Sequence, residues 1–150
     1  EGVVIPEFQT VREAVGFFKG RFDDGRVRIV KKAEKGAEES IYERPNQIYN
    51  ALQWLATGYM RIRLTGGNLE ESCRIETGME YRAHQSELTL SEYSDDYHAV
   101  VDGKRVVLEE HLAKGNTRDP KSTIRIGFAF DDHQVIVGYI GPHQRNRMTN

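Results

Sequence analysis

The residue types that metal-independent RNA cleavage requires occur in the last third of the chain. They are His111, Arg125 and His143. One imidazole can accept the proton of a 2′-hydroxyl, a second can protonate the leaving oxygen, and a guanidinium can stabilise the charge that develops on phosphorus. Histidine suits both proton transfers because its ordinary pKa is about 6.5. The sequence therefore predicts a catalytic set of His111, Arg125 and His143.

Basic residues near this set are expected to contact nucleic-acid phosphates. They are Lys121, Arg145 and Arg147. A second basic cluster lies near the N-terminus and fits either a phosphate-binding face or a solvated edge. It consists of Arg26, Arg28, Lys31, Lys32 and Lys35.

Other kinds of site lack their sequence motifs. The five histidines include no His-x-x-x-His pair, and the single cysteine, Cys73, supports neither a zinc site nor an internal disulfide. No glycine-rich phosphate loop or Gly-x-Ser-x-Gly elbow occurs. Asp131 and Asp132 are typical of a turn rather than of a metal site. We therefore expect no metal and no cofactor.

The elements that must position the catalytic set are strands. Two apolar runs within Ser122–His143 flank Asp131-Asp132-His133 and predict a β-hairpin. In its second half Val135, Val137 and Tyr139 alternate with Ile136, Gly138 and Ile140. A second hairpin is predicted from Tyr93–Val101 and Lys104–Leu108, joined by Asp102-Gly103. Between the hairpins, Glu109–Lys114 predicts one helical turn that ends at Gly115.

The N-terminal half has helical periodicity. Thr10 and Glu13 form a capping box for a helix over Val11–Lys19. Further elements are a strand Arg26–Val30, a weak helix or loop Lys31–Ser40, a main core helix Pro45–Leu64 and a short helix Leu69–Glu76 capped by Asn68. The sequence predicts one α+β domain over residues 1–150, with N-terminal helices packed on one face of a C-terminal antiparallel sheet of about 4–5 strands.

Composition narrows the class of protein. The chain has 150 residues, 38% hydrophobic and 29% charged, with a net charge of -2. Both ends are mildly basic and Asn68–Gly103 is acidic, which disfavours nonspecific coating of nucleic acid by the whole surface. No apolar run approaches the roughly 20 residues that cross a bilayer, so we expect a cytoplasmic protein without a membrane partner. Because the chain begins at Glu1, we also expect a piece of a longer protein with an adjoining domain or a protein partner.

Three short motifs carry a resemblance. They are His-Leu-x-x-Gly at 111–115, Arg-Ile-x-Phe-x-Phe-Asp at 125–131 and Val-Gly-x-x-Gly-x-His at 137–143. Together they resemble the closing segment of uncharacterised bacterial domains, and the last hairpin is similar to that of RelE/ParE-like toxins. In those toxins helices pack on an antiparallel sheet, and basic or histidine residues on the sheet cleave ribosome-associated mRNA. The resemblance covers the last third of the chain and implies that Arg125, His143 and Arg145 face an RNA phosphate.

The favoured hypothesis is a nucleic-acid-directed, toxin-like effector domain of a larger prokaryotic protein, a ribonuclease-like endonuclease that binds RNA or DNA. Two alternatives fit the same sequence. One is a non-catalytic interaction domain whose acidic segment Asn68–Gly103 binds a basic partner. The other is a small-ligand or modified-base pocket lined by Trp54, Tyr59 and Tyr81.

Overall fold

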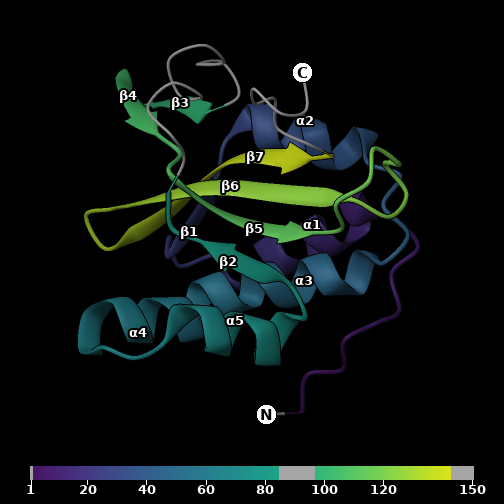
Figure 1. The fold of residues 1–150 in the computed structure, drawn as a ribbon, viewed down its shortest axis with the longest axis horizontal. Helices are drawn as coiled ribbons and strands as arrows, with labels where there is room; N and C mark the ends of the chain where they lie inside the picture. The colour runs from purple at the N-terminus through teal and green to yellow at the C-terminus, as the bar shows by residue number, and fades with distance from the viewer. Residues whose placement is uncertain (1, 85–96, 143–150) are drawn as a thin grey trace.

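Helices occupy the first half of the chain and strands the second half (Figure 1). The computed structural model describes residues 2–84 and 97–142. In chain order the elements are α1 Val11–Arg21, β1 Val27–Ile29, α2 Lys31–Glu39, α3 Pro45–Trp54, the π-helical turn η1 Leu55–Tyr59, α4 Met60–Thr65, α5 Leu69–Thr77, β2 Glu80–Arg82, β3 His98–Val101, β4 Lys104–Val107, β5 Glu110–Lys114, β6 Ile124–Asp131 and β7 Gln134–Gly141. The predicted α+β class is confirmed.

Local sequence signals determine where most helices begin and end. The Thr10 side chain accepts from the backbone of Glu13, and the Glu13 carboxylate accepts from the backbone of Thr10, so the predicted capping box is present. Asn68 caps α5 through the Glu71 backbone at 2.9 Å. The main core helix runs from Pro45 through α4, and its five-residue π turn is a feature that helical periodicity does not predict.

The main sheet has the strand order β1-β7-β6-β5-β2. The predicted β6–β7 hairpin is present, and its turn residues Asp132 and His133 have φ values of 51° and 61°. Positive φ at both positions is what a type I′ turn requires. The sheet is mixed rather than purely antiparallel, because β1 pairs in parallel with β7.

The predicted helical turn at Glu109–Lys114 is wrong, because Glu110–Lys114 forms strand β5. This strand is paired on both sides, with β2 and with β6. A five-residue segment of mixed polarity carries a weak local preference, and the hydrogen bonds of two neighbouring strands override it. His111 therefore lies on a central strand of the sheet.

A β-bulge at Gly138 changes which residues of β7 face the helices. Gly127 of β6 pairs with Tyr139, whereas the next residue of β6 pairs with Val137. Gly138 is thus an extra residue in β7, and Tyr139 lies on the face opposite Val137. The simple alternation expected from the sequence put Tyr139 and Val137 on one face, and the bulge makes that expectation wrong.

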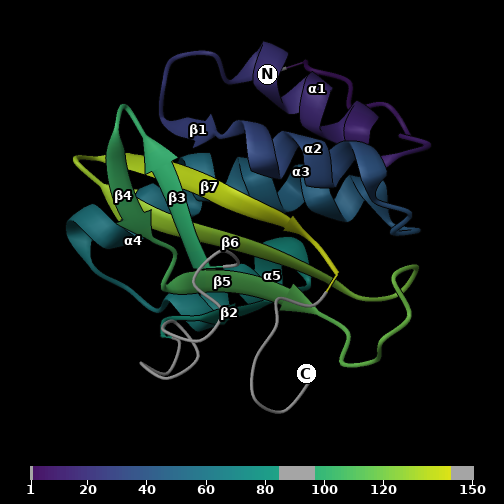
Figure 2. The ribbon, with the colours of Figure 1, turned by 90° about the horizontal axis from the view of Figure 1, so that it is seen from above.

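The two faces of the sheet are covered differently. The helices pack on one face around fully buried side chains such as Leu52, Leu55 and Phe128. On the other face, which we call the outer face, the β3–β4 hairpin packs on Ala129 and Ile136. Figure 2 shows α1 and α3 on the far side of the sheet from this hairpin. Arg82, His111, Arg125 and Tyr139 also lie on the outer face. Among the residues that the structure describes, none of the helices is long and apolar enough to cross a membrane.

Helix α2 lies unusually close to β7. A Cβ atom placed on Gly36 would lie 2.0 Å from the carbonyl oxygen of Ile140. Ala33 and Ala37, on the same side of the helix, are buried. Small residues on this side of α2 therefore allow the direct backbone contact, and the sequence segment that predicted either a helix or a loop is a helix because this packing stabilises it.

Replacing Gly36 tests the close contact. We expect Gly36→Ala to lower the free energy of unfolding by about 1 to 3 kcal/mol, because a strand backbone cannot make room for the added methyl group. Gly16→Ala in α1, where no atom beyond the adjoining helix backbone lies within 4 Å of the new Cβ, is the matched control and should be neutral or stabilise by up to about 1 kcal/mol. Urea unfolding of both variants measures the difference. A stabilised Gly36→Ala variant would contradict the packing.

Candidate functional site

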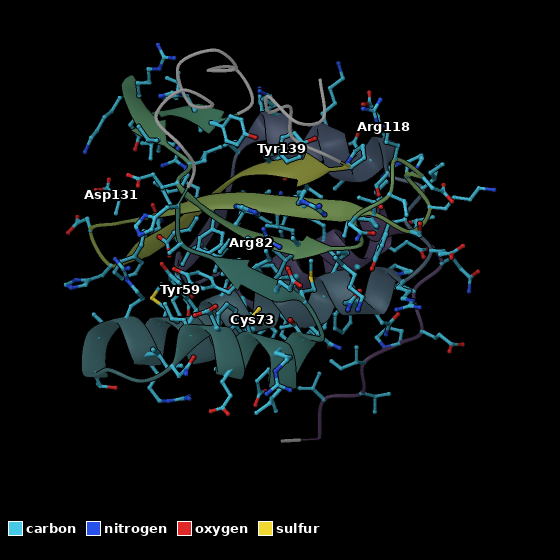
Figure 3. All side chains as sticks on the ribbon, in the orientation of Figure 1. Tyr59, Cys73, Arg82, Arg118, Asp131 and Tyr139 are labelled. Carbon is cyan, nitrogen blue, oxygen red and sulfur yellow. The ribbon has the colours of Figure 1, made fainter. Side chains whose placement is uncertain are left out.

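Strand register aligns three functional side chains in one row on the outer face. Arg82 of β2 pairs with His111 of β5, His111 pairs with Gly127 of β6, and Gly127 pairs with Tyr139 of β7. Directly paired residues share a face of the sheet, so the row runs Arg82, His111, Gly127, Tyr139. In Figure 3, β5 and β6 lie between the labelled Arg82 and Tyr139. Gly127, which is buried, stands between His111 and Tyr139 in this row.

A second row brings Arg125 beside the first. Arg125 pairs with Ala113 of β5 on one side and with Gly141 of β7 on the other, which places it diagonal to both His111 and Tyr139. The Tyr139 ring extends towards this second row, because a Cβ on Gly141 would lie 3.0 Å from the Tyr139 hydroxyl. His111, Arg125 and Tyr139 therefore converge on one part of the outer face.

His111 is held in its neutral form. Only 9% of the residue is exposed, and the pKa of its imidazole is lowered to about 4. Burial is the largest cause, the nearby guanidinium groups of Arg125 and Arg82 act in the same direction, and Glu80 opposes them. A neutral imidazole at neutral pH can accept a proton.

Arg125 is oriented by backbone carbonyls. Its Nη1 donates to the carbonyl oxygens of Ile124 at 2.9 Å and Lys114 at 3.2 Å. Burial lowers the pKa of Arg125, and the charge of Arg82 acts in the same direction. Within residues 2–84 and 97–142 it forms no ion pair with a carboxylate. The guanidinium charge of Arg125 is therefore suited to an external anion.

Arg82 makes an exposed pair that an anion can replace. Its Nη2 donates to Glu80 Oε1 at 2.6 Å, and more than half of each side chain is accessible to solvent. Exposed ion pairs contribute little net free energy, so a phosphate can exchange with the Glu80 carboxylate at low cost.

The predicted catalytic set is partly brought together. His111 and Arg125 lie next to each other on the same face, although His111 was expected in a helical turn. Lys121 lies in the β5–β6 loop, exposed and outside the two rows, and its carbonyl accepts from the Glu43 backbone at 3.0 Å. The remaining predicted residues, His143, Arg145 and Arg147, lie outside the described residues.

Two members of the site escaped sequence reasoning. Arg82 follows helix α5 in a strand of only three residues, and its alternation with Glu80 and Tyr81 is the one local signal that could have indicated its face. Tyr139 gave the wrong signal, because the bulge at Gly138 reverses its direction.

The residues of the N-terminal basic cluster lie in two different places. Arg26 binds Asp24 at 2.7 Å, and Arg28 binds both carboxylate oxygens of Asp102 at 3.0 and 3.1 Å. These two arginines therefore stabilise turns at one end of the sheet. Lys32 and Lys35 instead lie along α2, in a groove that Tyr139 also lines.

The aromatic residues of the predicted small-ligand pocket belong to the core. The rings of Trp54, Tyr59 and Tyr81 pack on one another with centroids 5.6 to 6.4 Å apart. The hydroxyls of Tyr59 and Tyr81 both donate to Oε1 of Glu110, each at 2.7 Å. Burial raises the pKa of both phenols, and Glu110 raises them further. A ligand at this place would have to displace core side chains.

Cys73, on helix α5, lies in the same region (Figure 3). It is fully buried, and burial raises the pKa of its thiol to about 11. A buried thiol with a raised pKa is a poor nucleophile, so Cys73 has a structural role in the core. In the described part of the chain, no three His, Cys, Asp or Glu side chains gather closely enough to hold a metal ion.

Comparison with protein-family models, with curated proteins and with solved structures finds no significant match to this chain. The likeness of the last hairpin to RelE/ParE-like toxins therefore stays a prediction. What supports a function is the arrangement of side chains on the outer face.

Titration of His111 should make stability depend on pH. Its folded pKa of about 4 lies below the usual 6.5, so the unfolded chain binds more protons between these values. The stability that comes from keeping His111 neutral is fully present above about pH 6.5 and is lost as the pH falls towards 4. Urea unfolding should therefore show that the free energy of unfolding falls more steeply with decreasing pH in the wild type than in His111→Gln, by up to about 1.4 kcal/mol per pH unit. Equal slopes would contradict the burial of a neutral imidazole.

The two tyrosine hydroxyls should contribute measurably to stability. We expect Tyr59→Phe and Tyr81→Phe each to lower the free energy of unfolding by about 1 to 3 kcal/mol, because a buried carboxyl oxygen loses a donor. Tyr42→Phe is the control, since its hydroxyl donates to the part-buried Gln47, and it should cost about 1 kcal/mol or less. If either variant loses no more stability than Tyr42→Phe, Glu110 finds other hydrogen-bond partners.

Proposed function

We propose that the protein binds RNA on the outer face of its sheet and cleaves it without a metal ion, as a toxin-like effector domain. The observation that carries this proposal is the convergence of Arg82, His111, Arg125 and Tyr139 on adjacent strands. Two guanidinium groups, a neutral imidazole and a phenol suit a phosphodiester with a neighbouring hydroxyl.

The arginines recognise the phosphate. A guanidinium can donate two parallel hydrogen bonds to phosphate oxygens. Arg82 exchanges Glu80 for the phosphate, and Arg125, anchored by two carbonyls, stabilises the additional negative charge of the phosphorane. Because only 9% of His111 is exposed, the substrate must lie directly against these arginines to reach the imidazole.

His111 accepts the proton of the 2′-hydroxyl. The 2′-oxygen then bonds to phosphorus, and the bond from phosphorus to the 5′-oxygen breaks. A bound phosphate raises the pKa of the imidazole, since an opposite charge favours the protonated form. The leaving 5′-oxygen takes a proton from a second acid, a role we assign to His143 on its sequence position alone, two residues beyond the end of β7.

The interaction-domain alternative rests on α5, which exposes Glu70, Glu71 and Glu76. This acidic surface would bind a basic partner and would need neither His111 nor Arg125. Residues 85–96 of the predicted acidic segment lie outside the described residues.

Cleavage assays with chelator test the catalytic proposal. We expect single-stranded RNA to be cut and DNA of the same sequence to remain intact, since DNA lacks the attacking 2′-hydroxyl. His111→Gln and His143→Ala should each lower the rate at least about 100-fold. His133→Asn, at the exposed hairpin turn, is the matched histidine control and should cut like the wild type.

Three results would overturn this mechanism. They are cleavage of DNA at the rate of RNA, loss of cleavage with chelator, and wild-type rates for His111→Gln in a variant that unfolds like the wild type. Salt-dependent RNA binding without cleavage would reduce the proposal to a nucleic-acid reader, and no RNA binding at all would favour the interaction domain.

A further inference from the structure

A groove runs between helix α2 and the end of strand β7. Its lining includes Lys32 and Lys35 from α2, Tyr139 and Gly141 from β7, and Pro120 from the β5–β6 loop. The backbone contact of Gly36 with Ile140 holds the helix against the strand, so the lysines are kept at a fixed distance from β7.

This groove is continuous with the proposed cleavage site. Tyr139 lines the groove and also belongs to the row that contains His111. Gly141 lines the groove and pairs directly with Arg125. Because Gly141 has no side chain, the Tyr139 hydroxyl lies close to the backbone of β7 at this position. A chain bound at Arg125 can therefore pass over Tyr139 into the groove.

The charges in the groove favour a polyanion. Lys32 and Lys35 are exposed and lie three positions apart on α2, which places them on neighbouring parts of one helix face. Glu39, one turn further along, lines the same groove and offsets one of these charges, so the charged lining residues Lys32, Lys35 and Glu39 sum to +1. Together with Arg125 and Arg82 the two lysines extend a line of cations from α2 to β2.

We propose that this groove binds the stretch of single-stranded RNA next to the scissile phosphate. Lys32 and Lys35 contact successive phosphates, and the half-buried ring of Tyr139 contacts an unpaired base. The aromatic ring between cations favours a single strand over a duplex, because only an unpaired base can stack on a side chain. The inference rests on the proposed function and adds to it the part of the substrate that is not cleaved.

Charge reversal on α2 tests the groove. Binding of a fluorescent oligouridine of about 8 nucleotides should weaken at least about 10-fold in Lys32→Glu/Lys35→Glu. The slope of the logarithm of the binding constant against the logarithm of salt concentration should fall by the amount expected for the loss of about two phosphate contacts. Arg12→Glu/Arg61→Glu makes the same change of charge at exposed positions on α1 and α4 and should stay within about twofold of the wild type. Tyr139→Leu should weaken binding while Tyr139→Phe, which keeps the ring, retains most of it.

Substrate length separates the groove from the cleavage site. A dinucleotide spans only the scissile phosphate, so the lysine variant should cleave it like the wild type while losing activity on the longer oligomer. If the wild type neither binds nor cuts RNA, the proposed function fails and the inference fails with it.

Two further outcomes would overturn the inference alone. In the first, the wild type cuts RNA and needs His111 to do so, but the Lys32→Glu/Lys35→Glu variant binds oligouridine as tightly as the Arg12→Glu/Arg61→Glu control. In the second, polyglutamate competes as well as oligouridine at equal charge, since this would indicate a groove for acidic peptides.

Discussion

The buried carboxyl group of Glu110 is the constraint on which the arrangement of the central strands depends. It lies 8% exposed and accepts hydrogen bonds from Tyr59 and Tyr81. A buried polar group without partners costs several kcal/mol, so Glu110 is stable only where both hydroxyls reach it. Those hydroxyls come from the π-helical turn and from β2. Because neighbouring residues of a strand point to opposite faces, a satisfied Glu110 on the core side directs His111 to the outer face.

Glycines shape the outer face around this strand. The bulge at Gly138 turns Tyr139 outward, and Gly141 leaves room for the Tyr139 hydroxyl. On this face Arg82 of β2 is exposed, Arg125 of β6 is half-buried and His111 of β5 is almost fully buried, while the β3–β4 hairpin packs on Ala129 and Ile136. The same sheet therefore supports a dry core on one side and a polar surface on the other.

Sequence reasoning succeeded where the signals are local. The capping box at Thr10, the hairpin turn at Asp102-Gly103 and the last hairpin depend on residues within a few positions of one another. It failed where partners distant in the chain decide. Residues 110–114 became a strand because β2 and β6 flank them, and Arg82 joined the site only through its register with His111. The convergence of His111 and Arg125 was predicted from two adjacent chain segments, yet its geometry depends on pairings that no local pattern contains.

The outermost strands of the main sheet have a consequence for how the protein associates. β1 and β2 are each three residues long, whereas β6 and β7 each have eight. Short outer strands present few unpaired backbone groups to another chain, which discourages the edge-to-edge pairing that leads to aggregation. In the described part of the chain, the long hydrogen-bonding strands are thus enclosed by neighbours. A protein with this sheet therefore offers other copies of itself little backbone on which to extend.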